Sequence, residues 1–210
     1  MFNKEAYERI KAEIPEKVKI LAATKTKPIE DIIEAVNSGV KIIGENYVQE
    51  ANEKYNQLKE LFKEQSVSFH LIGHLQSNKV KIAAEIFDCI QSVDSIKLAE
   101  KISNVCNELN KKMDIMIEVN FGEEQKSGIL ISELASLIEK IEALQNLNLL
   151  GLMCIPPKGK EEESYKKMKE LGEEYDLNEI SMGMSSDYKE AISYGSTIIR
   201  LGTILFGERK

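Results

Sequence analysis

Lys25 is the residue whose type and position are best suited to chemistry in this sequence. It follows a short apolar run in the string LAATKTKP, and Pro28 then stops the extended segment. A lysine at such a position is either a solvated charge at the end of a strand or an amine at the mouth of a pocket. An amine held away from water beside another cation has a lowered pKa, so more of it is the neutral nucleophile at pH 7.

A second set of polar residues lies near the C-terminus, in the strings SMGMSSD and RLGT. Ser185 and Ser186 are expected at the start of a helix, where free backbone N–H groups and the helix dipole favour an anion. Gly202 allows the backbone to approach a ligand closely, and Thr203 adds a hydroxyl donor. These residues are consistent with a phosphate site. Helix capping by Ser185 and a simple glycine turn at Gly202 are the structural alternative.

Arg200 supplies the second cation. Strand alternation places it on the same face as Gly202, in a run so apolar that a guanidinium needs a partner inside the fold. Two cations beside a phosphate-type loop favour an anionic ligand, whereas a salt bridge to Glu45 or Glu118 is the structural alternative for either cation. A neutral lysine at a phosphate site can form a Schiff base with a phosphorylated aldehyde. Pyridoxal 5′-phosphate (PLP) is the commonest cofactor of this kind.

The elements that must position these residues alternate between strand and helix along the chain. Eight short β-branched runs are separated by longer segments of helical periodicity, which predicts a parallel sheet covered by helices. The predicted strands are residues 18–25, 41–46, 68–73, 89–93, 114–120, 147–155, 179–184 and 198–203. Eight such units indicate a closed (β/α)₈ TIM barrel, preceded by an N-terminal helix. An open doubly wound sheet is the alternative, although no G-x-G-x-x-G follows the first strand.

In a barrel of this kind the functional residues lie at the carboxyl ends of the strands. The end of a predicted strand, or the position just after one, is occupied by Lys25, Asn46, His74 and Asn120. The two C-terminal strings also lie at strand ends. We find no linker or low-complexity segment, so residues 1–210 are interpreted as one barrel domain.

Composition excludes several classes of partner. The formal net charge of −7 argues against a nucleic-acid groove or an anionic membrane surface, and no apolar run is long enough to cross a bilayer. Cys89, Cys106 and Cys154 are widely spaced among apolar neighbours, and we interpret them as reduced core residues of a cytoplasmic protein. His70 and His74 lack a third ligand in the sequence, so no metal site is predicted.

Many separate motifs carry a resemblance to a known family. They occur in a fixed order from about residue 18 to the C-terminus: TKTKP, GENYVQE, HLIGHLQSNK, SVDS, KSGI, GLMCIPP, SMGMSSD and RLGTILFGER. In this order they are similar to the motifs of the pyridoxal phosphate homeostasis proteins. Proteins of this family resemble the barrel domain of bacterial alanine racemase standing alone.

The resemblance implies a fold-type III PLP-binding TIM barrel. The cofactor-binding residues that it implies are Lys25, Asn46, Ser185, Arg200, Gly202 and Thr203. Lys25 would hold PLP in an internal aldimine, Arg200 would face the pyridine nitrogen, and Asn46 would lie near the ring hydroxyl. The other three residues would contact the phosphate.

The resemblance also implies a function. Members of this family are regarded as carriers or buffers of intracellular PLP without an established catalytic activity. We therefore expect apo-PLP enzymes among the partners, as acceptors of the cofactor. We also expect a monomer. One alternative is a minimal PLP enzyme such as a weak amino-acid racemase, which would need a second acid/base such as Tyr47 or Tyr188. Another is a Schiff-base aldolase that uses no cofactor. Arg200 beside the ring nitrogen would disfavour the pyridinium form that carbanion chemistry needs.

Overall fold

The computed structural model describes residues 1–122 and 127–208. Lys126 of the KSGI motif and Arg209 of the last motif lie outside the described residues. Eight parallel strands close into a barrel, because β4 pairs with β5 as well as with β3. The barrel strands are β1 (Lys19–Ala23), β2 (Ile42–Glu45), β3 (Ser68–Leu71), β4 (Cys89–Val93), β5 (Met113–Asn120), β7 (Leu147–Cys154), β8 (Glu179–Ser181) and β9 (Ile198–Leu201). The predicted TIM barrel is therefore confirmed.

All eight predicted strands are present, and their sequences explain why. The residues of β2, β4 and β9 are buried on both faces, which is what an apolar β-branched run requires in a parallel barrel. The structure adds one very short strand, β6 (Ile129–Leu130), which pairs with the end of β5. It also adds a one-turn helix, α9 (Thr203–Phe206), after the last barrel strand.

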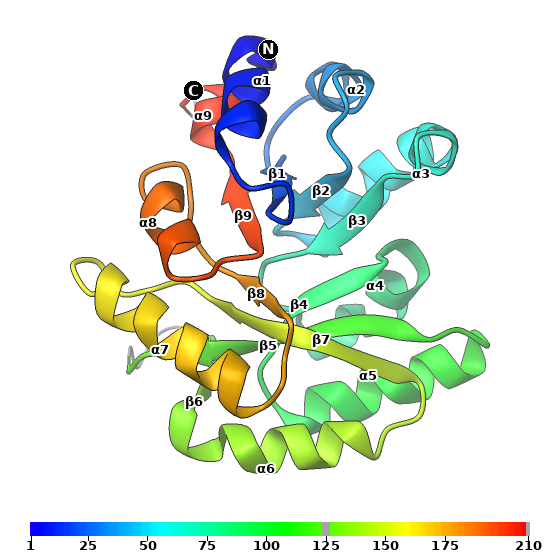
Figure 1. Ribbon diagram of the computed structural model, residues 1–210. Helices are drawn as coiled ribbons and strands as arrows, with labels where there is room; N and C mark the ends of the chain where they lie inside the picture. The colour runs from blue at the N-terminus through cyan, green and yellow to red at the C-terminus, as the bar shows by residue number, and fades with distance from the viewer. Residues whose placement is uncertain (123–126, 209–210) are drawn as a thin grey trace.

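Helices surround the barrel (Figure 1). The outer helices are α2 (Ile29–Asn37), α3 (Val48–Glu64), α4 (Val80–Ile86), α5 (Ile96–Glu108), α6 (Ile131–Glu142), α7 (Glu161–Glu174) and α8 (Tyr188–Ser193), with a 3₁₀ turn at Ser77–Lys79. Each longer helix turns an apolar stripe inward; α2, for example, buries Ile32, Ala35 and Val36 at helical spacing.

The predicted N-terminal helix is present as α1 (Lys4–Glu13) and packs beside α9 (Figure 1). The backbone N–H of Asn3 donates to Leu205 O at 2.7 Å, and the rings of Phe2 and Phe206 lie 5.5 Å apart between centroids. These contacts fix the segment that follows β9, which carries part of the predicted site.

An apolar layer fills the middle of the barrel. It consists of the buried residues Leu21, Ile42, Ile72, Cys89, Met116, Met153 and Ile198. Gly44 is needed beside this layer, because a Cβ there would lie 2.3 Å from Leu21 Cδ2. The layer supports the polar residues at the carboxyl ends of the strands.

The three cysteines are buried and free, as the sequence predicts. In the part of the chain that the structure describes, no helix is long and apolar enough to span a membrane.

Candidate functional site

A cavity of about 670 Å³ opens at the carboxyl ends of the barrel strands. All six predicted cofactor residues line it, although they come from segments far apart in the sequence. These residues are Lys25, Asn46, Ser185, Arg200, Gly202 and Thr203. Barrel closure places β1 between β2 and β9, so Lys25 lies between Asn46 and the last motif. The structure thus brings together every residue of the predicted site.

Lys25 is the second residue after the end of β1 at Ala23, and it is half-buried. Its Nζ lies 5.9 Å from the ring centroid of Tyr47, the residue that precedes α3. Tyr47 is 58% exposed, and Lys25 itself lines the cavity. The amine is therefore placed at the opening of a pocket, which favours the second of the two interpretations of the TKTKP motif.

The salt bridges that were the structural alternative for the two cations are not formed. Glu45 Oε1 pairs with Lys54 Nζ at 2.6 Å, and Glu118 Oε1 accepts a hydrogen bond from Ser127 Oγ at 2.9 Å. Burial raises the pKa of both carboxyl groups. Among the described residues, no carboxylate forms an ion pair with Arg200.

Arg200 is held by neutral groups instead. Its Nη1 donates to Ser181 Oγ at 2.8 Å and its Nη2 donates to the Cys154 carbonyl oxygen at 2.7 Å. The residue is only 5% exposed, and burial lowers the pKa of its guanidinium. A buried guanidinium whose hydrogen-bond partners are all neutral can attract an anionic or electron-rich group in the adjoining cavity.

A hydrogen-bonded chain behind Arg200 fixes its orientation. Ser181 Oγ donates to Gln91 Oε1 at 2.7 Å, which leaves the Gln91 amide nitrogen to donate to His70 Nδ1 at 2.8 Å. His70 Nε2 therefore carries the proton and donates to Ser68 Oγ at 2.8 Å. Burial lowers the pKa of His70 to about 3, so the ring is neutral. His70 is a structural residue of the barrel interior.

His74 does not share that role. Its Nδ1 lies 3.5 Å from Asp94 Oδ2 near the surface, away from His70. Among the described residues, no group of three or more His, Cys, Asp or Glu side chains is arranged to hold a metal ion.

The anion end of the cavity is built by the loops after β8 and β9. The backbone N–H groups of Gly202 and Ile204 both donate to Ser185 Oγ, at 3.2 and 3.3 Å. Two donors thus converge on one oxygen at the cavity wall, which is the donor arrangement a phosphate oxygen requires. Thr203, between them, is exposed. These residues fit a phosphate group.

The structural alternative for Ser185 and Gly202 holds in part, because Ser185 Oγ accepts from N–H groups at the start of α9 and Gly202 directly precedes that helix. The helix α8 is preceded by Asp187, whose Oδ1 accepts from the backbone N–H of Met184 at 2.5 Å, so Ser185 does not cap that helix. Gly202 has a negative φ, and a Cβ there would meet only Ala23, at 3.7 Å. A side chain at Gly202 would extend into the cavity, so the glycine keeps the space open.

Several residues of the cavity were not predicted from the sequence. Lys27 lines it, but its Nζ is held by the carbonyl oxygens of Phe206 and Gly207 at 3.0 and 3.3 Å. Ile72 and Ile155 add apolar walls. The second lysine of TKTKP was a visible signal, whereas the isoleucines look like ordinary strand residues.

The tyrosines and methionines separate into surface and core. Tyr47 lies beside Lys25, whereas Tyr188 is buried in the core. Met184 lines the cavity, whereas Met182 is fully buried in the core.

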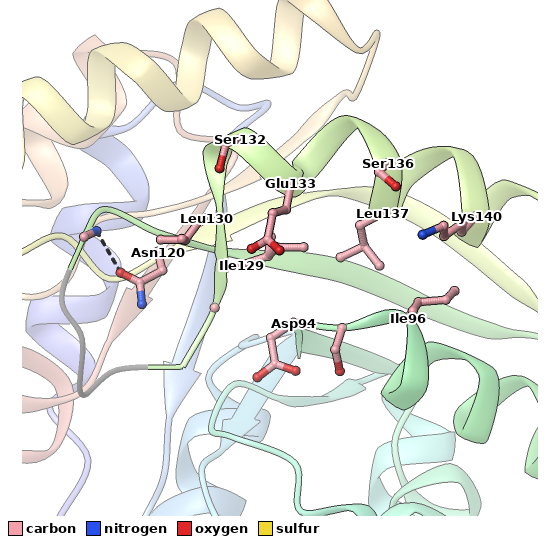
Figure 2. Close-up of a pocket in the computed structure, with 13 residues that line it drawn as sticks. Asp94, Ile96, Asn120, Ile129, Leu130, Ser132, Glu133, Ser136, Leu137 and Lys140 are labelled. Carbon is pink, nitrogen blue, oxygen red and sulfur yellow. Dashed lines mark hydrogen bonds between the residues drawn. The ribbon is translucent and has the colours of Figure 1, made fainter.

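A larger cavity of about 810 Å³ lies beside the carboxyl ends of β4 and β5, between α5 and α6 (Figure 2). Asp94 and Glu133 extend toward it from opposite walls, and Asn120 Oδ1 accepts from the Gly122 backbone N–H at 2.9 Å. None of the six predicted cofactor residues lines this cavity. Its charged lining residues are Asp94, Glu133 and Lys140, so carboxylates outnumber cations, which does not favour a phosphorylated ligand.

Comparison with known proteins shows which family the chain belongs to. A family model described as "Alanine racemase, N-terminal domain" matches residues 4–210. A pyridoxal phosphate homeostasis protein of Aquifex aeolicus is 43% identical and the match covers 91% of this chain and 87% of that protein. The protein of the same name from Synechocystis is 39% identical over the whole of both chains.

Solved structures of other proteins are also similar to this chain. PipY of Synechococcus elongatus, solved with PLP bound, is 34% identical with a TM-score of 0.89, covering 97% of this chain and 99% of that chain. An alanine racemase of Clostridium difficile is 16% identical with a TM-score of 0.78, covering 97% of this chain and 56% of that chain. The second likeness shows a shared fold.

Proposed function

Because this chain belongs to the pyridoxal phosphate homeostasis protein family, we propose that it binds PLP in the 670 Å³ cavity and serves the homeostasis of that cofactor. One observation carries the proposal: an amine, a guanidinium without an ion-pair partner among the described residues and convergent N–H donors line the same cavity. The PLP bound to PipY, a structural relative that this chain matches over 97% of its length, supports it.

Each end of the site would have its own task. Bound PLP supplies an aldehyde whose carbon can form a reversible bond to an amine with loss of one water, so no oxidant or reductant is needed. Lys25 supplies that amine, and Arg200 presents N–H donors toward the ring nitrogen. Gly202, Thr203 and Ser185 hold the phosphate, and Asn46 borders the ring on the side of β2.

The proposal favours storage and delivery over catalysis. A guanidinium at the ring nitrogen keeps a proton off that nitrogen, and an unprotonated ring is a poorer electron sink. The apolar side chains of Ile155 and Met184 at the cavity mouth are partly exposed, and so is Tyr47. An open mouth suits release of the cofactor to apo-PLP enzymes. A monomeric state and a cytoplasmic location stay predictions.

The proposal is tested by the absorption spectrum of the purified protein, before and after borohydride, followed by peptide mapping. We expect visible colour that borohydride removes, with the cofactor fixed to the peptide of Lys25. A colourless protein that reacts only when a sugar phosphate is present would favour the aldolase alternative. Delivery is tested separately: an acceptor apo-enzyme should be activated faster by the loaded protein than by an equal amount of free PLP.

A weak racemase is the second candidate, and the placement of Tyr47 beside Lys25 is the observation that favours it. A racemase needs a second proton-transfer group near the cofactor, and Tyr188 is too deeply buried to serve. Exchange of α-protons of amino acids for deuterium in heavy water, lost in Tyr47→Phe, would support this candidate. The homeostasis proposal expects no such exchange.

Thr203→Val is expected to weaken the binding of PLP about tenfold, because hydrogen bonds to a charged group contribute roughly 1.5–3 kcal/mol. Valine keeps the shape of threonine and removes only the hydroxyl. The dissociation constants of PLP and of pyridoxal, which lacks the phosphate, should be measured by fluorescence titration. The affinity for pyridoxal should not change, and an equal loss for both ligands would contradict the assignment of Thr203 to the phosphate.

A further inference from the structure

One face of α3 packs against the loop that carries Lys25. Tyr47, Glu50 and Lys54 are spaced so that they project from the same side of a helix. Lys25 Nζ lies over the ring of Tyr47, while Glu50 and Lys54 contact the loop on either side of Lys25. Two residues of α3 and the residue that precedes the helix therefore meet a single loop.

The two contacts beside Lys25 are made to the backbone. Lys54 Nζ donates to the carbonyl oxygen of Thr24 at 2.7 Å, and Glu50 Oε1 accepts from the backbone N–H of Thr26 at 2.5 Å. The same Glu50 oxygen also accepts from Lys54 Nζ at 2.7 Å. The residues before and after Lys25 are thus joined through one ion pair, and neither contact uses the amine of Lys25.

Lys54 is fully committed to this arrangement. Its side chain is 8% exposed, and its third hydrogen bond goes to Glu45 Oε1 at 2.6 Å. Thr24 Oγ1 donates to that same carboxyl oxygen at 2.6 Å. The buried ammonium of Lys54 therefore has three acceptors: Thr24 O, Glu45 Oε1 and Glu50 Oε1. Three hydrogen bonds define its position.

The loop needs such support because its backbone is strained. Thr26 has a φ of 62°, in the left-handed region that β-branched residues rarely adopt. A backbone of this kind persists only where its surroundings hold it, and such residues concentrate at functional sites. Without Glu50 as acceptor, Thr26 can relax toward ordinary φ values, and the direction of the preceding residue changes with it.

We propose that Glu50 and Lys54 are positioning residues that hold the backbone of Lys25 so that its amine points into the cavity. The inference rests on the proposed function, since it concerns how Lys25 captures an aldehyde. Displacement of a reacting group by about 1 Å can slow a reaction about 100-fold, so a clamp on the backbone beside the amine affects the rate of capture. Binding of the phosphate, at the far loops, does not depend on it.

The test compares two ligands in Glu50→Ala and Glu50→Gln. PLP is captured through its aldehyde, whereas pyridoxine 5′-phosphate has an alcohol at that position and reports only ring and phosphate binding. We expect Glu50→Ala to slow the borohydride-trapped capture of PLP by about tenfold or more and to leave the affinity for pyridoxine 5′-phosphate within about twofold. Glu50→Gln keeps an acceptor for Thr26 and should retain most of the capture rate.

Glu173→Ala is the control, because Glu173 and Lys169 have the same i, i+4 spacing on α7 but form an exposed pair. It should change neither measurement. Equal losses for the two ligands in Glu50→Ala, or an unchanged rate of capture, would overturn the proposal. Amide hydrogen exchange of the loop peptide in the cofactor-free protein tests the clamp independently: exchange must become faster in Glu50→Ala. If the wild-type protein binds pyridoxine 5′-phosphate but never captures PLP, the proposed function fails and the clamp is judged by exchange alone.

Discussion

Lys25→Ala is expected to abolish the covalent capture of PLP, which is the largest effect of any single change in this protein. The Lys25 amine, at the end of the first barrel strand, is the group that we assign to the aldehyde. Alanine has no amine. The phosphate loops and Arg200 are untouched, so PLP should still bind reversibly and more weakly. The measurement is the mass of the borohydride-reduced protein together with the visible absorption of the PLP-loaded form.

The second lysine of the same motif makes this a stringent test. Lys27 also lines the cavity, but its Nζ donates to the carbonyl oxygens of Phe206 and Gly207, which hold it away from the position of Lys25. Peptide mapping should therefore find no adduct at Lys27 in the Lys25→Ala protein. Lys189→Ala, at an exposed lysine that pairs with Glu13, is the control and should load normally. An adduct at Lys27 would show that the site has been assigned to the wrong amine.

Lys54→Met is expected to lower the free energy of unfolding by about 3–5 kcal/mol at pH 7, the range found when one member of a buried ion pair is removed. The Glu45 side chain has no exposed surface, and Lys54 is its only cationic partner among the described residues. Methionine keeps most of the lysine stem, so the loss reflects charge more than packing. Urea unfolding followed by circular dichroism gives the value.

The loss should depend on pH in a defined direction. Burial raises the pKa of Glu45 above 4.5, and Lys54 opposes that rise, so removing Lys54 raises the pKa further. Below the unfolded pKa both states bind the proton and the deficit is small. Just above the unfolded pKa, both proteins lose stability together, because Glu45 stays protonated in both folded states. Once the pH passes the folded pKa of wild-type Glu45, only the variant goes on losing stability, until its own Glu45 ionises in the folded state.

The double variant Lys54→Met with Glu45→Gln provides the control for this explanation. Glutamine removes the buried charge and still offers an oxygen to Thr24, so most of the lost stability should return and its dependence on pH should disappear. A single variant whose deficit is the same at pH 4 and pH 8 would contradict a role for the Glu45 charge.

The sequence by itself determined the barrel and the residues of its mouth. Eight apolar runs alternating with amphipathic segments can bury their faces only as parallel strands covered by helices, and this prediction holds at all eight barrel strands. Because parallel strands of a barrel end at one mouth, the positions of Lys25 and Arg200 in their strands are enough to predict that the two side chains lie near each other. The resemblance in the motifs then indicated the cofactor.

Only the tertiary structure decided which polar groups pair. In the sequence, Lys54 and Glu50 look like solvated charges of an amphipathic helix, and Glu45 looks like a partner for Lys25 or Arg200. In the barrel, Lys54 forms an ion pair with Glu45, and Arg200 donates to Ser181 and to the Cys154 carbonyl oxygen. Ser185 accepts from the backbone N–H groups of Gly202 and Ile204. Periodicity along the chain encodes which face of an element is buried. The pairing of groups many residues apart depends on strand register and barrel closure, and these exist only once the chain has folded.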